Sequence, residues 1–171
     1  MFEHEIHDCL TKNGASLVGF SALGDKASPD FPALRFAVTI VRKLSDTIVE
    51  TIDGRPSIQY FHHYRITNTK LDLLALDAVD FIEAHGFSAL PIAASQSTNT
   101  DKDAYRGVFQ HKTAAVLAGL GFIGKSGLFI TKEYGSKVRL ATVLTDMPLI
   151  PSGAVITEGC GACEICKNAC P

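Results

Sequence analysis

The stretch His111-Lys-Thr-Ala-Ala-Val-Leu-Ala-Gly-Leu-Gly-Phe-Ile-Gly-Lys-Ser126 narrows the possible folds of this chain more than any other. Its second half fits both the dinucleotide fingerprint G-x-G-x-x-G and the P-loop G-x-x-x-x-G-K-[ST]. Both patterns need a strand before the glycines and a helix after them, because the amides at the helix start must face the phosphates. Here residues 108–118 have a helical pattern and Leu128-Phe-Ile-Thr131 reads as a strand. Since this order is reversed, we reject both nucleotide sites and expect a helix stop with a tight turn, or a loop whose backbone approaches another large cofactor.

Apolar periodicity on both sides of this stretch indicates helices and strands in a mixed order. The predicted helices are 2–12, 44–52, 57–85 (in two pieces or as one long helix) and 108–118, and the predicted strands are 16–20, 35–42, 87–93, 128–131 and 138–145. Within 57–85, Leu71, Leu74, Ala78 and Ile82 fall on one helical face. The last two strands are expected to form a hairpin at Tyr134-Gly-Ser136. The fold class is therefore α/β in the broad sense (α+β), with a mixed sheet and flanking helices. We expect a cofactor-binding domain at 1–150 and a linker with a cysteine tail at 151–171.

The tail reads Cys160-Gly-Ala-Cys163-Glu-Ile-Cys166-Lys-Asn-Ala-Cys170-Pro171. This C-x₂-C-x₂-C-x₃-C-P spacing is that of a bacterial ferredoxin-type [4Fe–4S] half-motif, in which the fourth cysteine serves the other cluster of the pair. A structural zinc site is the alternative, although zinc motifs usually pair two C-x₂₋₄-C units across a longer loop. A disulfide framework would need a secreted protein, and the first residues are no signal peptide. Cys9, the remaining cysteine, is a weak candidate ligand.

The composition sets few limits on function. The chain has 171 residues and a formal net charge of −2, which gives no global attraction to nucleic acid. No apolar run reaches the ~18 residues of a membrane span. Clustered, reducible cysteines indicate a cytoplasmic protein. The oligomeric state is left open.

The glycine stretch and the cysteine tail together resemble the epoxyqueuosine reductase family. The segments that carry the resemblance are His111-Lys112, Ala118–Leu128, Tyr134-Gly-Ser136, Val138-Arg-Leu140, Leu144-Thr-Asp-Met-Pro-Leu149 and the cysteine motif. The family implies a cobalamin-binding domain, related in fold to flavin nitroreductases and to the corrinoid domain of reductive dehalogenases, followed by a ferredoxin-like module with two clusters. The single cysteine motif here predicts a truncated or shortened member with a partial ferredoxin-like tail.

By this resemblance the chain is an iron–sulfur oxidoreductase. Electrons would pass from a [4Fe–4S] cluster to cobalamin, or less readily to FMN, and then to an unknown substrate. In tRNA-modifying members the substrate is epoxyqueuosine in tRNA, and a ferredoxin or flavodoxin would supply the electrons. A non-catalytic electron-transfer or cofactor-binding module is the alternative function.

The candidate site residues follow from the cysteine spacing and from the family resemblance. The expected metal ligands are Cys160, Cys163, Cys166 and Cys170, and the candidate cofactor-binding residues are His111, Lys112, Gly119, Gly121, Gly124 and Lys125. The family's acidic proton donor aligns near Tyr105, which becomes a weak catalytic candidate. His111-Lys112 stands where the family has Glu-Arg.

Overall fold

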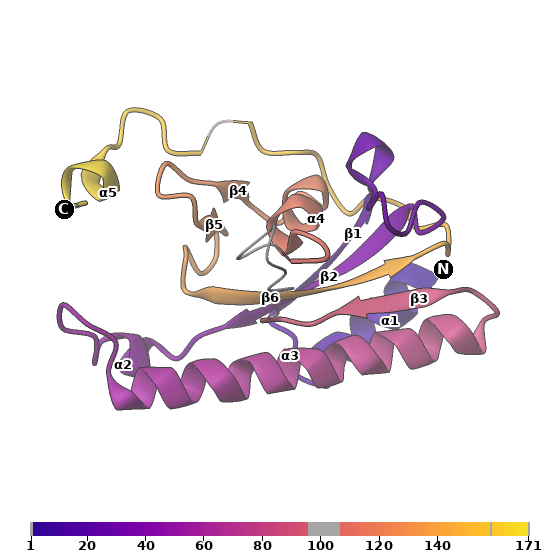
Figure 1. The fold of residues 1–171 in the computed structure, drawn as a ribbon, viewed down its shortest axis with the longest axis horizontal. Coiled ribbons are helices and arrows are strands. Elements are labelled where there is room, and N and C mark those ends of the chain that lie inside the picture. The colour runs from indigo at the N-terminus through magenta and orange to yellow at the C-terminus, as the bar shows by residue number, and fades with distance from the viewer. Residues whose placement is uncertain (1, 96–106, 158, 171) are drawn as a thin grey trace.

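The computed structural model describes residues 2–95, 107–157 and 159–170. The elements in chain order are α1 (Phe2–Lys12), β1 (Leu17–Ala22), a 3₁₀ turn (Gly24–Lys26), β2 (Phe36–Lys43), α2 (Asp46–Val49), α3 (Ile58–Ala84), β3 (Ala89–Ile92), α4 (His111–Leu117), β4 (Phe122–Ile123), β5 (Phe129–Ile130), β6 (Val138–Thr145) and α5 (Ile165–Asn168) (Figure 1). Most predicted helices and strands are confirmed within a few residues. The helix expected over 44–52 is much shorter, because only the turn of α2 forms there.

The central sheet has four strands in the order β1-β2-β6-β3, and every neighbouring pair is antiparallel. The prediction of a mixed sheet is therefore wrong for the described strands. The physical reason lies in the crossover from β2 through α3 to β3. These two strands run in the same direction, but β6 lies between them and pairs with each in the opposite sense.

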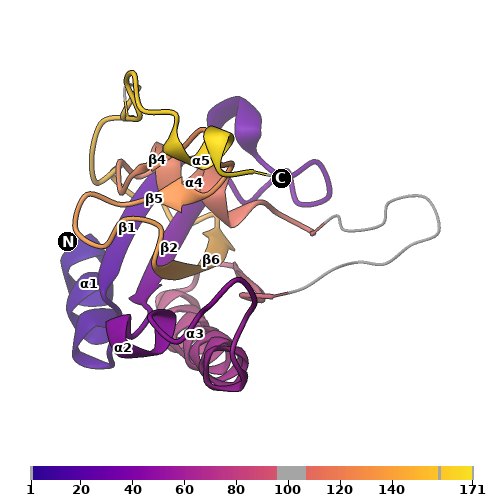
Figure 2. The ribbon, with the colours of Figure 1, turned by 90° about the vertical axis from the view of Figure 1, so that its left-hand side faces the viewer.

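Helices cover the two faces of this sheet unequally. α1 and α3 pack on one face, whereas α4 and the small β4–β5 sheet lie over the other (Figure 2). The strands alternate between the two layers with a period of two. On β2, Val38 and Ile40 face α3, while Ala37 and Val41 face the α4 side.

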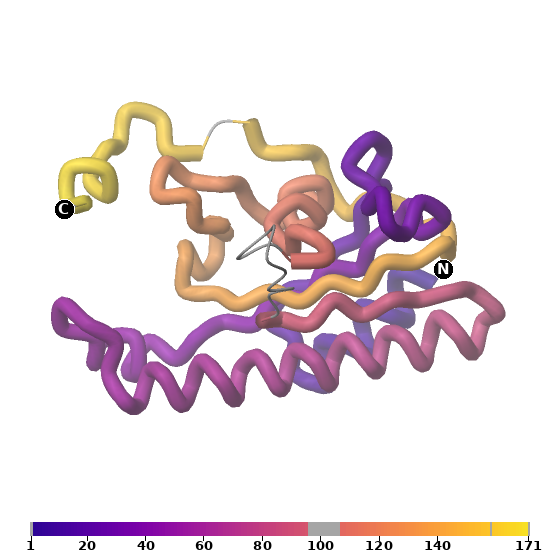
Figure 3. Tube along the Cα trace, in the orientation of Figure 1, coloured from indigo at the N-terminus to yellow at the C-terminus, as the bar shows by residue number. Residues whose placement is uncertain are grey.

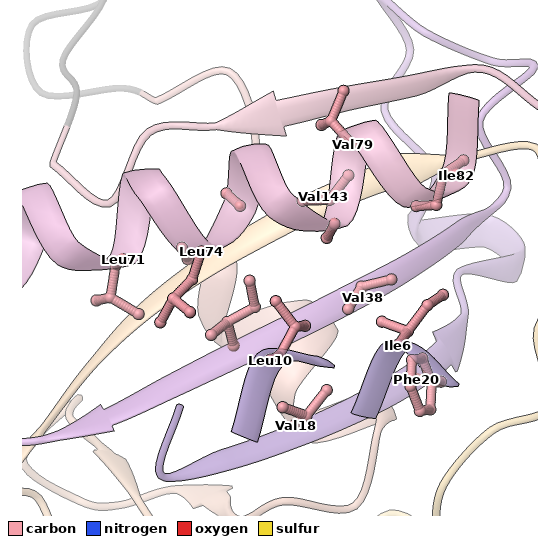
Figure 4. Close-up of a cluster of buried hydrophobic side chains, with 14 of the residues drawn as sticks. Ile6, Leu10, Val18, Phe20, Val38, Leu71, Leu74, Val79, Ile82 and Val143 are labelled. Atoms are coloured by element: carbon pink, nitrogen blue, oxygen red, sulfur yellow. The ribbon is translucent and has the colours of Figure 1, made fainter. Parts of the chain in front are cut away.

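Apolar side chains, most of them aliphatic, fill the space between α1, α3 and the sheet. The members drawn in Figure 4 include Ile6, Leu10, Val18, Phe20, Val38, Leu71, Leu74, Val79, Ile82 and Val143. Leu71, Leu74 and Ile82 of α3 have no exposed surface. The helical stripe expected over residues 71–82 is thus confirmed as the principal core face.

α3 runs without interruption over 27 residues. Ser57 caps its first turn by accepting a hydrogen bond from the Tyr60 amide at 3.0 Å. Gly86 follows its end with φ +81, a conformation that only glycine adopts without strain, and the Gly86 amide bonds back to Glu83. The region 57–85 is therefore one helix rather than two.

Small residues bring α4 close to the opposite face of the sheet. Ala114, Ala115 and Ala118 are almost fully buried there. A Cβ at Gly19 of β1 would lie 3.0 Å from the Ala118 Cβ and 2.9 Å from the Leu120 side chain. This strand therefore needs glycine where α4 and the loop after it cross over.

The hairpin expected between 128–131 and 138–145 does not form. β5 pairs with β4 instead, and β6 pairs with β2 and β3. The Tyr134–Ser136 turn closes only an isolated bridge between Thr131 and Gly135. The two-residue strand β4 lies within the glycine stretch. It pairs with β5, the strand that we expected to pair with β6.

After β6 the chain returns across the molecule on the α4 side to reach the cysteine tail (Figure 3). Ser152 fixes this return segment to β1, because its amide donates to Phe20 O at 3.0 Å and its hydroxyl accepts from Phe20 N at 2.8 Å.

Within the described ranges, no helix is both long enough and apolar enough to cross a membrane.

Candidate functional site

A pocket of about 380 Å³ opens on the α4 side of the sheet. The end of β3, the start of α4, β5 and the first residues of β6 form its walls. Its lining includes Ile92–Ser95, Gly107–Lys112, Leu128, Phe129, Ser136 and Val138–Leu140. This volume falls in the range of small-ligand sites and would hold a small molecule or one edge of a larger planar cofactor.

His111 stands in the wall of this pocket at the first position of α4. Its Nε2 lies 3.0 Å from the carbonyl oxygen of Ala93, and its Nδ1 lies 2.9 Å from the hydroxyl of Thr142. A carbonyl can only accept, so Nε2 carries the proton and Nδ1 accepts from the threonine. Burial of the ring, reinforced by the nearby Arg139 charge, lowers the His111 pKa and favours this neutral form. His111 thus joins α4 to β3 and β6.

Arg139, at the β6 wall of the pocket, connects the sheet to α3. Its Nε donates to Asn68 Oδ1 at 2.9 Å, and its Nη2 donates to Ala94 O at 3.0 Å. The guanidinium carbon lies 4.2 Å from the centre of the Tyr64 ring, within the range of a cation–π contact. Sequence reasoning missed this arrangement. The sequence does contain a signal for it. Arg139 interrupts an otherwise apolar strand, and Asn68 lies on the inward face of a predicted helix.

The segment Ala93–Ser95, which follows β3 and borders the pocket, is held by groups from three elements. Ala94 N donates to Asp72 Oδ1 at 2.8 Å, while His111 and Arg139 hold the carbonyls of Ala93 and Ala94. Burial raises the Tyr64 pKa, but its hydrogen bond to Ser95 and the Arg139 charge outweigh this and leave the pKa lowered. The backbone at this rim is therefore fixed before any ligand binds.

Lys112 lies beside His111 but turns to the outside of the molecule. Its ammonium group donates to the carbonyl of Gly127 at 2.8 Å and so bridges α4 to the turn before β5. Because Lys112 also lines the pocket, it places a positive charge at the opening. Its role as a cofactor-binding residue stays a prediction. Tyr105, the catalytic candidate, lies outside the described residues.

The order of elements around the glycine stretch is the one expected from the sequence. α4 ends at Leu117, Gly119 follows with φ +71, and no helix begins after Gly124 before β5. The helix C-terminus presents carbonyl groups to this loop, which repel phosphate. The P-loop and dinucleotide interpretations are therefore excluded.

Other parts of the chain pack closely against the three glycines. A Cβ at Gly119 would lie 2.9 Å from Ala154 O, and a Cβ at Gly121 would lie 2.2 Å from Ile130 O. A Cβ at Gly124 would lie 2.4 Å from Ile130 Cδ1 and 3.4 Å from Cys160 Sγ. The glycines therefore allow the backbone of this loop to lie close to the return segment, β5 and the cysteine tail. A cofactor contact at the glycines stays a prediction.

Lys125 fastens the start of the cysteine tail to this loop. Its backbone N–H donates to Cys160 Sγ at 3.4 Å, and its ammonium group donates to Gly161 O at 3.0 Å. The same ammonium lies 3.5 Å from Glu164 Oε1. Beside these contacts is a second hollow of about 540 Å³, lined by Phe122, Ile123, Lys125, Ile156, Thr157 and Gly159–Gly161. The β4–β5 hairpin thus has the pocket on one side, at Leu128 and Phe129, and Cys160 on the other.

All five cysteines are free thiols. Cys160 is half-buried against the loop, whereas Cys163, Cys166 and Cys170 are exposed. The spacing of the four tail thiols matches a ferredoxin-type motif, in which three cysteines serve one cluster and the fourth serves another. In the part of the chain that the structure describes, no three acidic, histidine or cysteine side chains converge on one point. The tail therefore supplies suitable ligands but does not hold them together.

Comparison with known proteins gives partial but consistent matches. A tetrachloroethene reductive dehalogenase of Sulfurospirillum multivorans is 39% identical over 94 residues, which are 53% of this chain and 16% of that protein. An epoxyqueuosine reductase of Bacillus subtilis (strain 168) is 31% identical over 109 residues, which are 64% of this chain and 25% of that protein. The chain therefore spans a quarter or less of these curated relatives. No protein-family model matches it.

Solved structures agree over nearly the whole chain. A crystal structure of epoxyqueuosine reductase matches 99% of this chain and 52% of its own, with a TM-score of 0.66 and 22% identity. A catabolic reductive dehalogenase matches 88% of this chain and 22% of its own, with a TM-score of 0.70 and 16% identity. Another similar structure is an epoxyqueuosine reductase with an epoxyqueuosine-modified tRNA stem loop.

The antiparallel sheet with its unequal helical layers is thus an α+β fold shared with reductases. Both kinds of relative are oxidoreductases by name. The chain is similar to epoxyqueuosine reductases and to reductive dehalogenases over part of their length.

Proposed function

We propose that this chain is the cofactor-binding part of an iron–sulfur reductase, in which a [4Fe–4S] cluster passes electrons to a corrinoid. Residues 1–150 would form the corrinoid domain, and 151–171 would begin the electron-delivery module. The observation that carries this proposal is the position of the β4–β5 hairpin, between Cys160 and the pocket. A cluster at Cys160 would lie on the opposite side of one thin hairpin from the ligand in the pocket.

Cys160, Cys163 and Cys166 would hold the cluster, with a fourth ligand from elsewhere, and Cys170 would serve a second cluster. The Lys125 amide already donates to Cys160 Sγ. Hydrogen bonds to a cluster's sulfurs are among the factors that set its reduction potential. Lys125 would therefore position the cluster and stabilise its reduced, more negative state.

The pocket would take one edge of a corrinoid, with FMN as the less favoured cofactor. When bound, a corrinoid supplies a metal centre that can be reduced and can then reduce a substrate. Arg139, Ser95 and Lys112 would orient polar groups of the ligand from the rim. Similarity to reductases whose names include tetrachloroethene or epoxyqueuosine supports reduction as the reaction class. The similar structure that holds a tRNA stem loop supports tRNA as the proposed substrate carrier. A ferredoxin or flavodoxin is the proposed electron donor, by analogy with the family that the sequence resembles.

The first test is anaerobic reconstitution of the full chain with ferrous iron and sulfide, followed by iron counting and spectroscopy. We expect cluster absorption and up to about four iron atoms per chain. Cys163→Ser should abolish the cluster, whereas Cys170→Ser and the matched control Cys9→Ser should retain it. A zinc site would behave differently, because it would use all four tail cysteines and lose its metal in Cys170→Ser as well.

The second test is a titration of the chain with hydroxocobalamin and, separately, with FMN. Ser136 is exposed and lines the pocket, so Ser136→Trp would fill the opening at little cost to folding. We expect it to weaken cobalamin binding at least tenfold, while the exposed Lys132→Trp should not. Binding that is unchanged in Ser136→Trp would contradict the pocket assignment. Cofactor binding without turnover under any electron donor would favour the alternative, a non-catalytic electron-transfer or cofactor-binding module.

A further inference from the structure

The outward face of α3 carries large apolar side chains that are more than half exposed in the described structure. Ile66, Leu73 and Leu76 are 56%, 53% and 51% exposed. Figure 1 shows α3 along one edge of the molecule, with no other described element beyond it. Its inward face is fully used by the core, so this helix is apolar on two opposite sides. An exposed apolar stripe of this kind marks a contact surface.

The residues of this stripe follow a regular spacing. The exposed positions His62, Ile66, Thr69, Leu73, Leu76 and Asp80 are separated by four, three, four, three and four residues. Steps that alternate between three and four residues keep a stripe on one side of a helix, as in helices that pair with one another. The series is the same in both directions, so the stripe matches a second copy of itself laid antiparallel.

The charges on this face also suit antiparallel pairing, because they have opposite signs at its two ends. Its beginning carries His62 and Arg65, and its end carries Asp80 and Glu83. Among the described residues, Arg65, Asp80 and Glu83 make no ion pair. Antiparallel pairing of two copies would place each basic end against an acidic end, whereas parallel pairing would place like charges together.

We propose that α3 is a self-association surface, on which a second copy of the chain binds antiparallel about a two-fold axis between Thr69 and Leu73. Ile66 of one copy then faces Leu76 of the other, and Thr69 faces Leu73. His62 lies opposite Asp80 at both ends. The contact is isologous and closes as a dimer. One helix from each copy is a small interface, so the dimer forms at micromolar concentrations and dissociates at nanomolar ones.

The test is sedimentation equilibrium of the full chain from about 0.1 to 100 μM, with reductant present because the tail thiols are exposed. We expect a monomer–dimer equilibrium in the wild-type chain. Leu73→Asp should remain monomeric over this range, with an unchanged melting temperature in dilute solution, because Leu73 is exposed in the monomer. Val155→Asp, at another exposed apolar position, should dimerise as the wild type does.

The antiparallel register has its own test at pH 7.5. His62→Glu places a second carboxylate opposite Asp80 and should weaken the dimer about tenfold. The double variant His62→Glu/Asp80→Lys restores an attractive pair at both ends, and we expect it to regain wild-type affinity. A parallel dimer would not be rescued, since it would align lysine with lysine. A wild-type chain that stays monomeric at 100 μM, or a Leu73→Asp chain that dimerises normally, would overturn the proposal.

Discussion

The two faces of the sheet are packed in different ways. Against α1 and α3, long aliphatic side chains interdigitate in a continuous layer around Leu71 and Leu74. Against α4 and the β4–β5 hairpin, alanines and glycines bring backbones together, and the buried polar group Thr142 binds His111. The pocket and the cysteine tail both lie on this second side. One face thus stabilises the fold, and the other holds a site whose geometry depends on close contacts.

The largest loss of stability should come from substitutions on the side of the sheet that packs against α1 and α3, called here the aliphatic face. Leu74→Ala removes a fully buried side chain, and we expect the free energy of unfolding to fall by about 2–5 kcal/mol. Denaturant unfolding measures this loss. Leu73→Ala, one residue away but 53% exposed, serves as the matched control, and at submicromolar concentration it should change stability by less than about 0.5 kcal/mol. Equal losses in the two variants would mean that α3 is rotated relative to the structure.

Gly121→Ala should lower stability through the other side of the sheet, which packs against α4 and the β4–β5 hairpin and is called here the polar face. A Cβ there would lie 2.2 Å from Ile130 O, so the hairpin must shift, at a cost of about 1–3 kcal/mol. Because the hairpin contacts Cys160, iron incorporation should also fall. Gly153→Ala is the control, since its nearest neighbour would be 3.6 Å away, and it should behave as the wild type. Normal cluster assembly in Gly121→Ala would separate the glycine loop from the cysteine site.

Acid should weaken the polar face through His111. The folded state lowers the His111 pKa below its usual 6.5, so the unfolded chain binds the proton more readily. Stability is therefore complete above this value and declines as the pH falls through 6.5, until the folded form also takes up a proton. Comparison of wild type with His111→Gln by denaturant unfolding at several pH values isolates this contribution. The free energy of unfolding of the wild type should change more steeply with pH, by at most about 1.4 kcal/mol per pH unit. Parallel curves for the two proteins would contradict a role of His111 in this pH dependence.

The smallest effect on stability should come from Lys125→Met. An exposed ion pair contributes little, so we expect less than about 1 kcal/mol. The cysteine tail, however, should become several-fold more sensitive to limited proteolysis, because its link from Lys125 to Gly161 is lost. Lys167→Met is a close control, since Lys167 binds the same Glu164 at 2.8 Å without reaching the loop. If both variants are cut at the same rate, Lys125 does not anchor the tail.

The aliphatic face was predictable from the sequence, and the polar face only in part. The helical repeat of Leu71, Leu74 and Ile82 identifies the core side of α3 directly, since local periodicity determines it. β4 could not be predicted, because two residues inside a glycine stretch carry no periodic signal. Its pairing with β5 is what displaced the expected hairpin.

The site depends on contacts between residues far apart in the chain. The sequence predicts Lys125 as a cofactor-binding residue, and the structure adds a contact that the sequence does not indicate, between its ammonium group and Gly161 O. Arg139 lies in a segment that carries the family resemblance, and the structure shows that its side chain reaches Asn68 and Ala94 in two other parts of the chain. Such contacts depend on the insertion of β6 between β2 and β3, which no local pattern encodes.

That insertion has a consequence for biosynthesis. β6 is a central strand of the sheet and also the last to leave the ribosome. Until it emerges, β2 and β3 have no partner on their facing edges, and the hydrogen-bonding groups that β6 will occupy stay open. Until then, the open edges of β2 and β3 are exposed to edge-to-edge aggregation. Closure of the sheet therefore depends on one long-range pairing step, which must wait until β6 is available.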